Sequence, residues 1–291
     1  MSNGVSDDQA DVDVIVESLT LEEIDKNLYR GHPTYWERGR LFGGTVAAQA
    51  LSAANHTIDG INVHSLHSYF LRPGDPTIPV IFDVDRIRDG RSFATRRVVA
   101  RQRGEAIFNL SASFHGEEDG FEHQRPEPDV PPPDDFHSPE DFGLTGRDYL
   151  PNGWQTKGLP IEMKRDHGPD DWTEAQSIRR LWFRINGNLP DDDGLHNVLL
   201  TYMSDLALMS TAVRFHKPGF DSIMAASLDH AMWFHRKVRV NEWLLYDMQS
   251  PSAQGGRGLN FGHIYTEHGV LVASAAQEGL MRPIDPTRSS T

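Results

Sequence analysis

The sequence predicts an α+β protein built from two similar units, each a helix followed by a meander of antiparallel strands. Two observations indicate this architecture: a small-residue helical segment at 41–58 precedes four strand-like segments, and an apolar helical segment at 195–216 precedes a second set. A third observation is that landmark residues of the two halves keep nearly one spacing along the chain. Residues 16–118 and 174–285 are therefore predicted to form the two units.

The first unit is predicted from the change of periodicity along its residues. Gly43 and Gly44 open the segment LFGGTVAAQALSAANHTI, whose apolar residues recur at helical spacing. The strands that follow are separated by glycine-containing turns and occupy residues 63–75, 79–90, 92–104 and 105–116. Residues 1–15 precede the unit, are acidic and polar, and are predicted to be a disordered tail.

The second unit follows a segment of different composition. Residues 119–173, which include RPEPDVPPPDDFHSPEDFG, are rich in proline and acid and are predicted to be a connector lying over the surface. A strand at 177–189 then leads through a turn to the helix at 195–216. The strand at 225–236 and three further strands complete the unit, and residues 286–291 form a second predicted tail.

The composition excludes several classes of protein. The 291-residue chain has a formal net charge of −14, which argues against nucleic-acid binding, although a few placed arginines can still bind an anionic small ligand. No apolar run approaches the roughly 18 residues that span a bilayer, so no membrane insertion is expected. The acidic N-terminus is neither a signal nor a transit peptide. The absence of cysteine excludes a thiol nucleophile and fits a cytoplasmic protein.

A duplication is supported by three pairs of matching positions. The pairs are Ser65 and Ser227 at 162 residues, Gly44 and Asp205 at 161, and Ser113 and Gln277 at 164. Each unit is a helix wrapped by an antiparallel sheet, which is the hot-dog pattern, so the chain is predicted to be a double hot-dog with its two sheets joined side by side. The members Asp205, Ser227 and Gln277 all fall in the second unit, which is therefore predicted to carry the chemistry.

The predicted strand at 225–236, AASLDHAMWFHR, combines burial with polar residues. Ser227, Asp229, His230 and His235 lie among its apolar residues, and buried polar groups need partners or a function. Ser227 is interpreted either as a strand-end serine bonded to the backbone or as a residue that orients water. It is not predicted to be a nucleophile, because the chain contains no G-x-S-x-G elbow.

Asp205 lies in VLLTYMSDLALMSTAV, a helical segment that is apolar nearly all round. An unpaired carboxylate there would be strongly destabilising or would become protonated. One interpretation is that Ser204 or Asp205 caps a shorter helix starting midway, and the other is a general base in an apolar pocket. Gln277 ends the apolar strand VLVASAA, where it either packs or holds a water or a carbonyl group with its amide.

The sequence predicts neither a metal site nor a bound cofactor. His230 and His235 differ in parity along one strand and would lie on opposite faces, as would His64 and His67, and there is no H-E-x-x-H motif. GGRGLNFG at 255–262 precedes a strand and lacks the strand–turn–helix setting of a dinucleotide site, so it is predicted to be a turn.

Nine segments are long or chemically unusual enough to suggest a family. They are LFGG-x-V-x-x-QAL, HSYFLRPGD, RDG-x-SF-x-x-RRV, SASFH, FEHQ, SDL, LDHAMWFHR, NEWLLY and ASAAQEGLMR. With them, residues 20–116 and 177–283 resemble the acyl-CoA thioesterase II family, the TesB-like double hot-dog enzymes. The resemblance implies hydrolysis of acyl-CoA thioesters to free CoA and fatty acid, and hence a role in lipid metabolism.

The resemblance also implies the catalytic residues. They are Asp205 in YMSDL, Ser227 in SLDHAMWFH and Gln277 in AAQEGLMR. A water activated by Asp205 and oriented by Ser227 and Gln277 would attack the thioester without a covalent intermediate, since a thioester carbonyl is electrophilic enough for a positioned water to suffice. Bacterial members often have threonine at the Ser227 position, and serine keeps the hydrogen-bonding oxygen, so activity is expected to survive.

Two other functions stay open on the residues alone. A hot-dog hydratase or dehydratase acting on acyl-CoA would use an Asp/His pair at the helix start, and no histidine stands beside Asp205 in the sequence. A non-catalytic acyl-CoA or lipid-binding protein would bind the ester without releasing thiol. The first unit is expected to supply an acyl tunnel through its small-residue helix, and a homo-oligomer, such as a dimer of double hot-dogs, is expected from exposed sheet edges.

Overall fold

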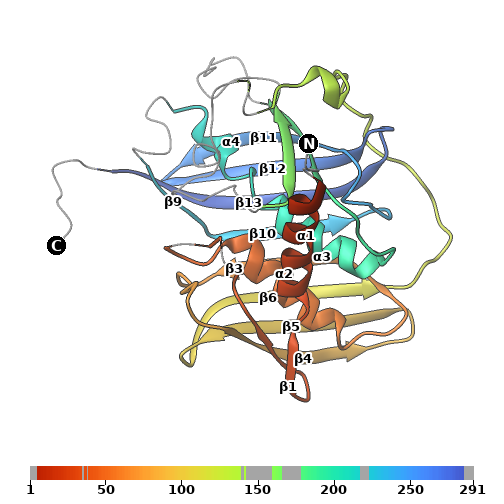
Figure 1. Ribbon diagram of the computed structural model, residues 1–291, viewed down its shortest axis with the longest axis vertical. Coiled ribbons are helices and arrows are strands. Elements are labelled where there is room, and N and C mark those ends of the chain that lie inside the picture. Colours follow the sequence, from red (N-terminus) through yellow and green to blue (C-terminus); the bar gives the residue numbers. More distant parts are fainter. Residues whose placement is uncertain are drawn as a thin grey trace.

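The computed structural model in Figure 1 describes residues 5–34, 36–37, 39–138, 141, 159–165, 178–216 and 223–284. Its centre is one antiparallel sheet of thirteen strands. The strands are β1 Glu22–Asp25, β2 Leu28–Gly31, β3 Asn62–Phe70, β4 Val80–Asp89, β5 Phe93–Gln102, β6 Glu105–His115, β7 Ile161–Arg165, β8 Ile178–Ile185, β9 Ile223–Ser227, β10 Asp229–Phe234, β11 Leu244–Gln254, β12 Arg257–Thr266 and β13 Leu271–Pro283. The tail predicted at 286–291 lies outside the described residues.

The order of the strands confirms the predicted double hot-dog. The sheet runs β1-β2-β4-β5-β6-β3-β10-β13-β12-β11-β8-β7, with β9 beside β13, so each half repeats the same succession outward from the β3–β10 pair. Ser68 is paired with His230, 162 residues later, and its Oγ donates to the His230 carbonyl oxygen at 2.7 Å. The spacing predicted from Ser65 and Ser227 therefore marks the pseudo-twofold axis between the two units.

Two helices lie against each other across this axis. They are α2 Gly43–Asn55 and α3 Asp193–Ser204. Together with the N-terminal helix α1, Val5–Leu19, they cover one face of the sheet near its middle (Figure 1). A methyl group at Gly44 would come within 2.5 Å of the Tyr202 carbonyl oxygen, so glycine at this position allows α2 and α3 to approach closely.

The helix spacing corrects one predicted correspondence. α2 begins at Gly43 and α3 at Asp193, 150 residues later, so Asp205 at the end of α3 corresponds to Asn55 at the end of α2. Gly44 is therefore a contact of Asp205 and not its counterpart. The single offset mismatched them because the segment between the helix and the central strand is longer in the second unit, where it runs from Ser204 to Asp229, than in the first, where it runs from Asn55 to Asn62.

The helix predicted at 195–216 is interrupted. α3 ends at Ser204, a turn follows, and the short helix α4 occupies Ser210–Val213. Bonds from Leu206 N to Met203 O and from Ser210 N to Ala207 O span three residues, as in tight turns. The apolar pattern hid the break because the turn is nearly as buried as the helix.

The N-terminal tail prediction is wrong. Residues Val5–Leu19 form the helix α1, in which Val12, Ile15 and Leu19 are buried at helical spacing. The side chain of Gln49 in α2 donates to the Ser18 carbonyl oxygen at 2.8 Å, and further contacts hold the end of α1 on α2. The prediction relied on the acidic composition of this segment and overlooked its stripe of apolar residues, which packs on the core.

The connector prediction for residues 119–173 is wrong in part. Within it, Ile161–Arg165 forms β7, which pairs with β8 at the edge of the sheet. The Gln124 side chain also substitutes for a strand partner, donating to Gly269 O at 2.8 Å and accepting from Leu271 N at 3.1 Å. Because a side-chain amide can pair with backbone groups, this segment is hydrogen-bonded to the start of β13 without being a strand.

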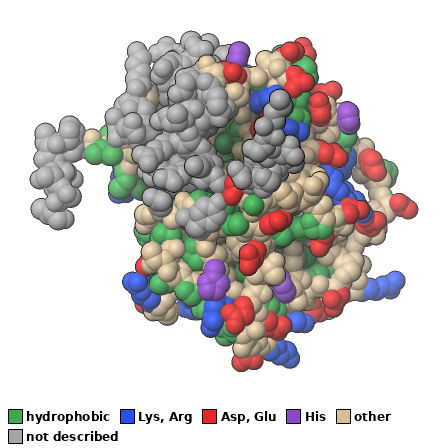
Figure 2. All heavy atoms as spheres, viewed as in Figure 1, with side chains coloured by type: hydrophobic (Ala, Val, Ile, Leu, Met, Phe, Trp, Pro, Cys, Tyr) green, Lys and Arg blue, Asp and Glu red, His purple; other side chains and the backbone are tan. Residues whose placement is uncertain are grey.

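Acidic and basic side chains are interspersed over the face of the molecule shown in Figure 2. Within the described part of the chain, no helix is both long and apolar enough to cross a membrane.

Candidate active site

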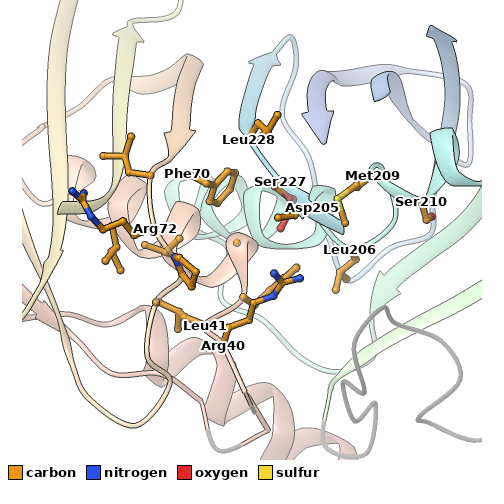
Figure 3. A pocket seen from close by; sticks show the side chains of 18 residues that line it. Arg40, Leu41, Phe70, Arg72, Asp205, Leu206, Met209, Ser210, Ser227 and Leu228 are labelled. Atoms are coloured by element: carbon orange, nitrogen blue, oxygen red, sulfur yellow. The ribbon is translucent and has the colours of Figure 1, made fainter. Parts of the chain in front are cut away.

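A cavity of about 280 Å³ lies where the two units meet. The loop before α2 and the start of α2 form one wall, the end of α3 and the turn after it form another, and β9 closes a third (Figure 3). Both units contribute to the lining, and α2 supplies only Gly43 and Val46. The lining is mainly apolar, with Asp205, Ser227 and a few other polar groups among it.

Asp205 follows the last residue of α3 and is only 8% exposed. Its carboxylate accepts hydrogen bonds from Gln277 Nε2 at 2.5 Å, from the backbone N–H of Gly44 and from the Ser227 side chain. Burial raises the pKa of Asp205 from 3.8 to about 7, and the hydrogen bonds oppose this rise only in part. A carboxyl group with this pKa exchanges a proton readily near neutral pH.

Ser227 and Gln277 complete a connected trio with Asp205. Gln277, on β13, is fully buried, and its Nε2 also donates to Ser227 Oγ at 3.2 Å. Ser227 is the last residue of β9, which pairs with β13. The Gln277 Oε1 atom is buried and has no hydrogen-bond partner among the described residues.

The structure thus brings together the three residues predicted for catalysis. It also excludes one of the two interpretations of Asp205, because the N-cap position of α4 is Met209 and not Ser204 or Asp205. The Ser227 hydroxyl group is hydrogen-bonded to the other two residues of the trio, Asp205 and Gln277. The Gln277 amide donates to the side chains of Asp205 and Ser227.

The start of α2 is a part of the site that the sequence did not predict. A methyl group on Gly43 would lie 2.6 Å from Asp205 Oδ2 and 2.9 Å from Phe70 Cε1, so the carboxylate and the ring need this glycine. The N-terminal N–H groups of a helix carry partial positive charge, which favours an anion beside them. The sequence does contain a pair of glycines at the start of this helix. Their contact with Asp205 could not be predicted from the pair alone, because that contact crosses the pseudo-twofold axis.

The site occurs at one end of the helix pair and not at the other. At the corresponding position beside Gly194, α2 carries Asn55 in place of an acid. Ser113, which was matched to Gln277, has its Oγ 2.8 Å from His64 Nε2 and lies on the alternate side of β6 from the buried residues. The prediction that only the second unit supplies the acid and amide agrees with this geometry, although the Ser113 match is wrong.

The predicted strand at 225–236 is two strands, because Leu228 interrupts it between β9 and β10. Asp229 Oδ1 accepts from Glu278 N at 2.7 Å, which bridges this break. His235 Nε2 lies 2.9 Å from Ser274 Oγ. These two polar residues therefore have structural partners outside the trio.

His230 is fully buried next to the site without joining the trio. Its Nε2 lies 2.9 Å from the Oγ of Ser204, the neighbour of Asp205. Burial lowers the pKa of His230 to about 4, so the ring is neutral at physiological pH. It holds the end of α3 in place but is not hydrogen-bonded to Asp205 as an acid–base pair.

Two charged residues of the loop before α2 were also missed. Glu37 is buried and accepts from Thr45 Oγ1 at 2.6 Å and from Phe42 N at 3.1 Å, which fixes the start of α2. Arg40 lines the cavity and donates to Ala225 O at 2.9 Å, and its charge lowers the pKa of Asp205. No periodicity indicated these roles, because both residues lie in an irregular loop.

The described residues contain no group of three or more His, Cys, Asp or Glu side chains that could hold a metal ion. The Asp205 carboxylate and the Ser227 hydroxyl, which line the cavity, are in contact with each other and with the buried Gln277 amide. Such a set can hold a water molecule and accept a proton from it.

The fold and this trio define a double hot-dog protein equipped for acid–base chemistry. Two family models match, "Acyl-CoA thioesterase N-terminal domain" over residues 32–115 and "Acyl-CoA thioesterase" over residues 153–280. The chain is 38% identical to acyl-coenzyme A thioesterase 8 of Mus musculus, covering 92% of this chain and 89% of that protein. It is 37% identical to acyl-CoA thioesterase 2 of Haemophilus influenzae, covering 92% and 96%. The chain therefore belongs to the acyl-CoA thioesterase II family.

Similar solved structures support the same family and fold. The acyl-CoA thioesterase II TesB2 of Mycobacterium marinum shares 43% identity with a TM-score of 0.78, covering 93% of this chain and 99% of that one. A protein of Alicyclobacillus acidocaldarius described as having a hot-dog fold shares 18% identity with a TM-score of 0.76, which shows the fold alone.

Proposed function

We propose that the protein hydrolyses acyl-CoA thioesters to free CoA and a fatty acid. The observation that carries this proposal is the position of Asp205: its carboxylate is buried in an apolar cavity, is held by three donors and has a pKa raised to about 7. General-base catalysis is most effective when the pKa of the base lies near the working pH. The names of the relatives support the same reaction.

In the proposed mechanism a water molecule bound beside the trio gives its proton to Asp205 as its oxygen attacks the thioester carbonyl carbon. Gln277 Oε1 and Ser227 Oγ orient that water. The negative charge that develops on the carbonyl oxygen faces the N-terminal end of α2 at Gly43, where the helix dipole stabilises it. When the C–S bond breaks, Asp205 returns the proton to the departing sulfur, which yields the thiol and the acid.

Direct attack by water is favoured over a covalent acyl-enzyme because of how the trio is bonded. The Ser227 hydroxyl bonds Asp205 and accepts from Gln277, and within the described part of the chain no histidine is hydrogen-bonded to it. A serine nucleophile needs an adjacent base and a helix-start or elbow setting, and Ser227 instead ends a strand.

The two alternative functions predict different products. A hydratase would need an Asp/His pair, whereas His230 is bonded to Ser204 and is neutral. A binding protein would leave the thioester intact. Incubation of the protein with decanoyl-CoA and a thiol reagent separates these functions, since only hydrolysis releases free CoA.

The role of the trio is tested by variants in the same assay. Asp205→Asn is expected to lower kcat by about 10²–10⁴-fold, the range that a general base contributes. Gln277→Ala is expected to lower it less, because the base remains. Asp83→Asn, which alters an exposed carboxylate on β4, serves as the control and should keep the wild-type rate. Wild-type protein that releases no thiol from acyl-CoA would overturn the proposal.

A further inference from the structure

Three arginines of the first unit lie on the turn after β3 and on the hairpin between β5 and β6. Arg72 lines the cavity, yet its side chain is 54% exposed, so it lies where the cavity wall meets solvent. Arg101 and Arg103 belong to the neighbouring hairpin between β5 and β6. The turn after β3 and this hairpin are joined by two ion pairs: Arg72 with Glu105 at 3.3 Å, and Arg103 with Asp75 at 2.9 Å.

The turn that carries Arg72 is firmly held. Gln102, which is 7% exposed, accepts from Asp75 N at 2.8 Å and donates to Asp75 O at 2.8 Å and Ile78 O at 3.0 Å. On the other side, Leu41 N donates to Gly74 O at 2.8 Å, which ties the turn to the loop before α2. A ligand that binds Arg72 therefore meets a preorganised backbone and avoids most of the entropic cost of ordering a loop.

The acidic partners of these arginines are weakly bound. The side chain of Glu105 is 69% exposed, and exposed ion pairs contribute about 0–1 kcal/mol. Arg72 also donates to the Ala106 carbonyl oxygen at 2.7 Å, which fixes the direction of its guanidinium group. A phosphate group can replace Glu105 at Arg72 with little loss, and it would gain stronger charge-assisted hydrogen bonds.

This positive group is not a general property of the fold. The hairpin between β12 and β13 corresponds to the β5–β6 hairpin in the second unit, and it carries Glu267 and His268 where the first has arginines. The whole chain has a formal net charge of −14. Local cations beside the cavity are therefore needed if a polyanionic substrate is to approach it.

Arg40 also lines the cavity, and the length of the substrate shows which of the two arginines is better placed to bind its phosphate groups. About thirteen bonds of the pantetheine arm separate the thioester sulfur from the first phosphorus atom, a reach of roughly 15 Å when extended like four to five residues of chain. Arg40 acts electrostatically on Asp205 and is therefore too near the reacting carbonyl. In Figure 3, Arg72 lies at the opposite edge of the cavity, with Phe70 between it and Asp205.

We propose that Arg72, supported by Arg101 and Arg103, binds the phosphate groups of CoA and directs the pantetheine arm into the cavity. The acyl chain then extends the other way, along Leu206 and Met209. This inference rests on the proposed thioesterase function, since it names the part of the molecule that recognises the CoA half of that substrate.

The test compares two thioesters of the same acid. Decanoyl-CoA carries the phosphates, and the N-acetylcysteamine thioester of decanoate does not. Arg72→Met is expected to lower kcat/KM for decanoyl-CoA by about 10-fold or more, mainly through KM, as loss of a charge-assisted hydrogen bond predicts. The same variant should hydrolyse the N-acetylcysteamine ester within about twofold of wild type, and Arg72→Lys should restore most of the activity on decanoyl-CoA.

Arg30→Met is the matched control, because Arg30 also pairs with an exposed glutamate but lies on β2 and does not line the cavity. It should not discriminate between the two esters. Equal losses by Arg72→Met on both esters would show a structural role and overturn the inference, as would an unchanged kcat/KM for decanoyl-CoA. Wild-type protein that hydrolyses neither ester would instead overturn the proposed function, and the inference with it.

Discussion

Replacement of Asp205 by asparagine is expected to stabilise the folded protein above neutral pH. The pKa of Asp205 is about 7 in the folded state and near 3.8 when unfolded, so the folded state binds the proton more tightly. Stability that is present below pH 3.8 is therefore lost as the pH rises to about 7. At about 1.4 kcal/mol for each unit of pKa difference, the ionised carboxylate destabilises the wild type by about 4 kcal/mol at pH 8.

The asparagine variant removes this pH-dependent penalty and adds a smaller constant one. The three groups that donate to Asp205 cannot all be satisfied by one amide oxygen, which costs about 1–3 kcal/mol whatever the pH. Urea unfolding of both proteins at pH 5, 6, 7 and 8 isolates the first effect. The free energy of unfolding of Asp205→Asn minus that of the wild type should increase by about 3 kcal/mol between pH 5 and pH 8.

The reasoning would be refuted if that difference were constant with pH or became smaller as the pH rose. Either result would mean that the folded Asp205 is already ionised at pH 5, so its environment does not raise its pKa. The stabilised variant should at the same time be nearly inactive, because the same burial that destabilises the fold provides a base near neutral pH.

Substitutions at three further positions test other parts of the structure. Gly43→Ala places a methyl group against the Asp205 carboxylate, so thiol release should fall about 10-fold or more while the fold survives; wild-type activity would contradict the contact. Ser227→Thr should retain most activity and Ser227→Ala should lose about 10-fold; equal rates for the two would remove the hydroxyl from the mechanism. Ile15→Ala, at a fully buried position of α1, should cost about 2–5 kcal/mol in urea unfolding, against less than about 0.5 for Glu17→Ala at an exposed position of the same helix; equal effects would contradict docking of α1.

The sequence sufficed for the fold class because the repeated element order and the Ser65–Ser227 spacing are properties of the chain itself. That spacing coincides with the pairing of Ser68 and His230 at the pseudo-twofold axis. The same logic failed for the helices, because the segment between α3 and β10 is longer than the segment between α2 and β3, so the offset of the strands does not apply to the helices. A match between equivalent positions of the two units does not indicate which residues are in contact across the axis. Gly44 and Asp205, which are in contact, were therefore interpreted as equivalent positions of the two units.

The elements missed were those whose composition disagrees with their packing. α1 is acidic overall, and only its stripe of three apolar residues, Val12, Ile15 and Leu19, is buried. β7 lies in a proline-rich region and is held by pairing with β8 rather than by its own periodicity. The trio itself was predictable through the family resemblance, whereas Glu37 and Arg40 act through irregular backbone that no residue pattern indicates.

The most direct test of the account is the pH dependence of kcat/KM for decanoyl-CoA, measured by thiol release from pH 5.5 to 8.5. For the wild type, we expect kcat/KM to rise about tenfold per pH unit below an apparent pKa of about 7 and to level off above it, as the ionised form of Asp205 accumulates. In Asp205→Asn this rise should vanish along with most of the activity. A flat wild-type profile, or a rise that persists in the variant, would contradict Asp205 as the base.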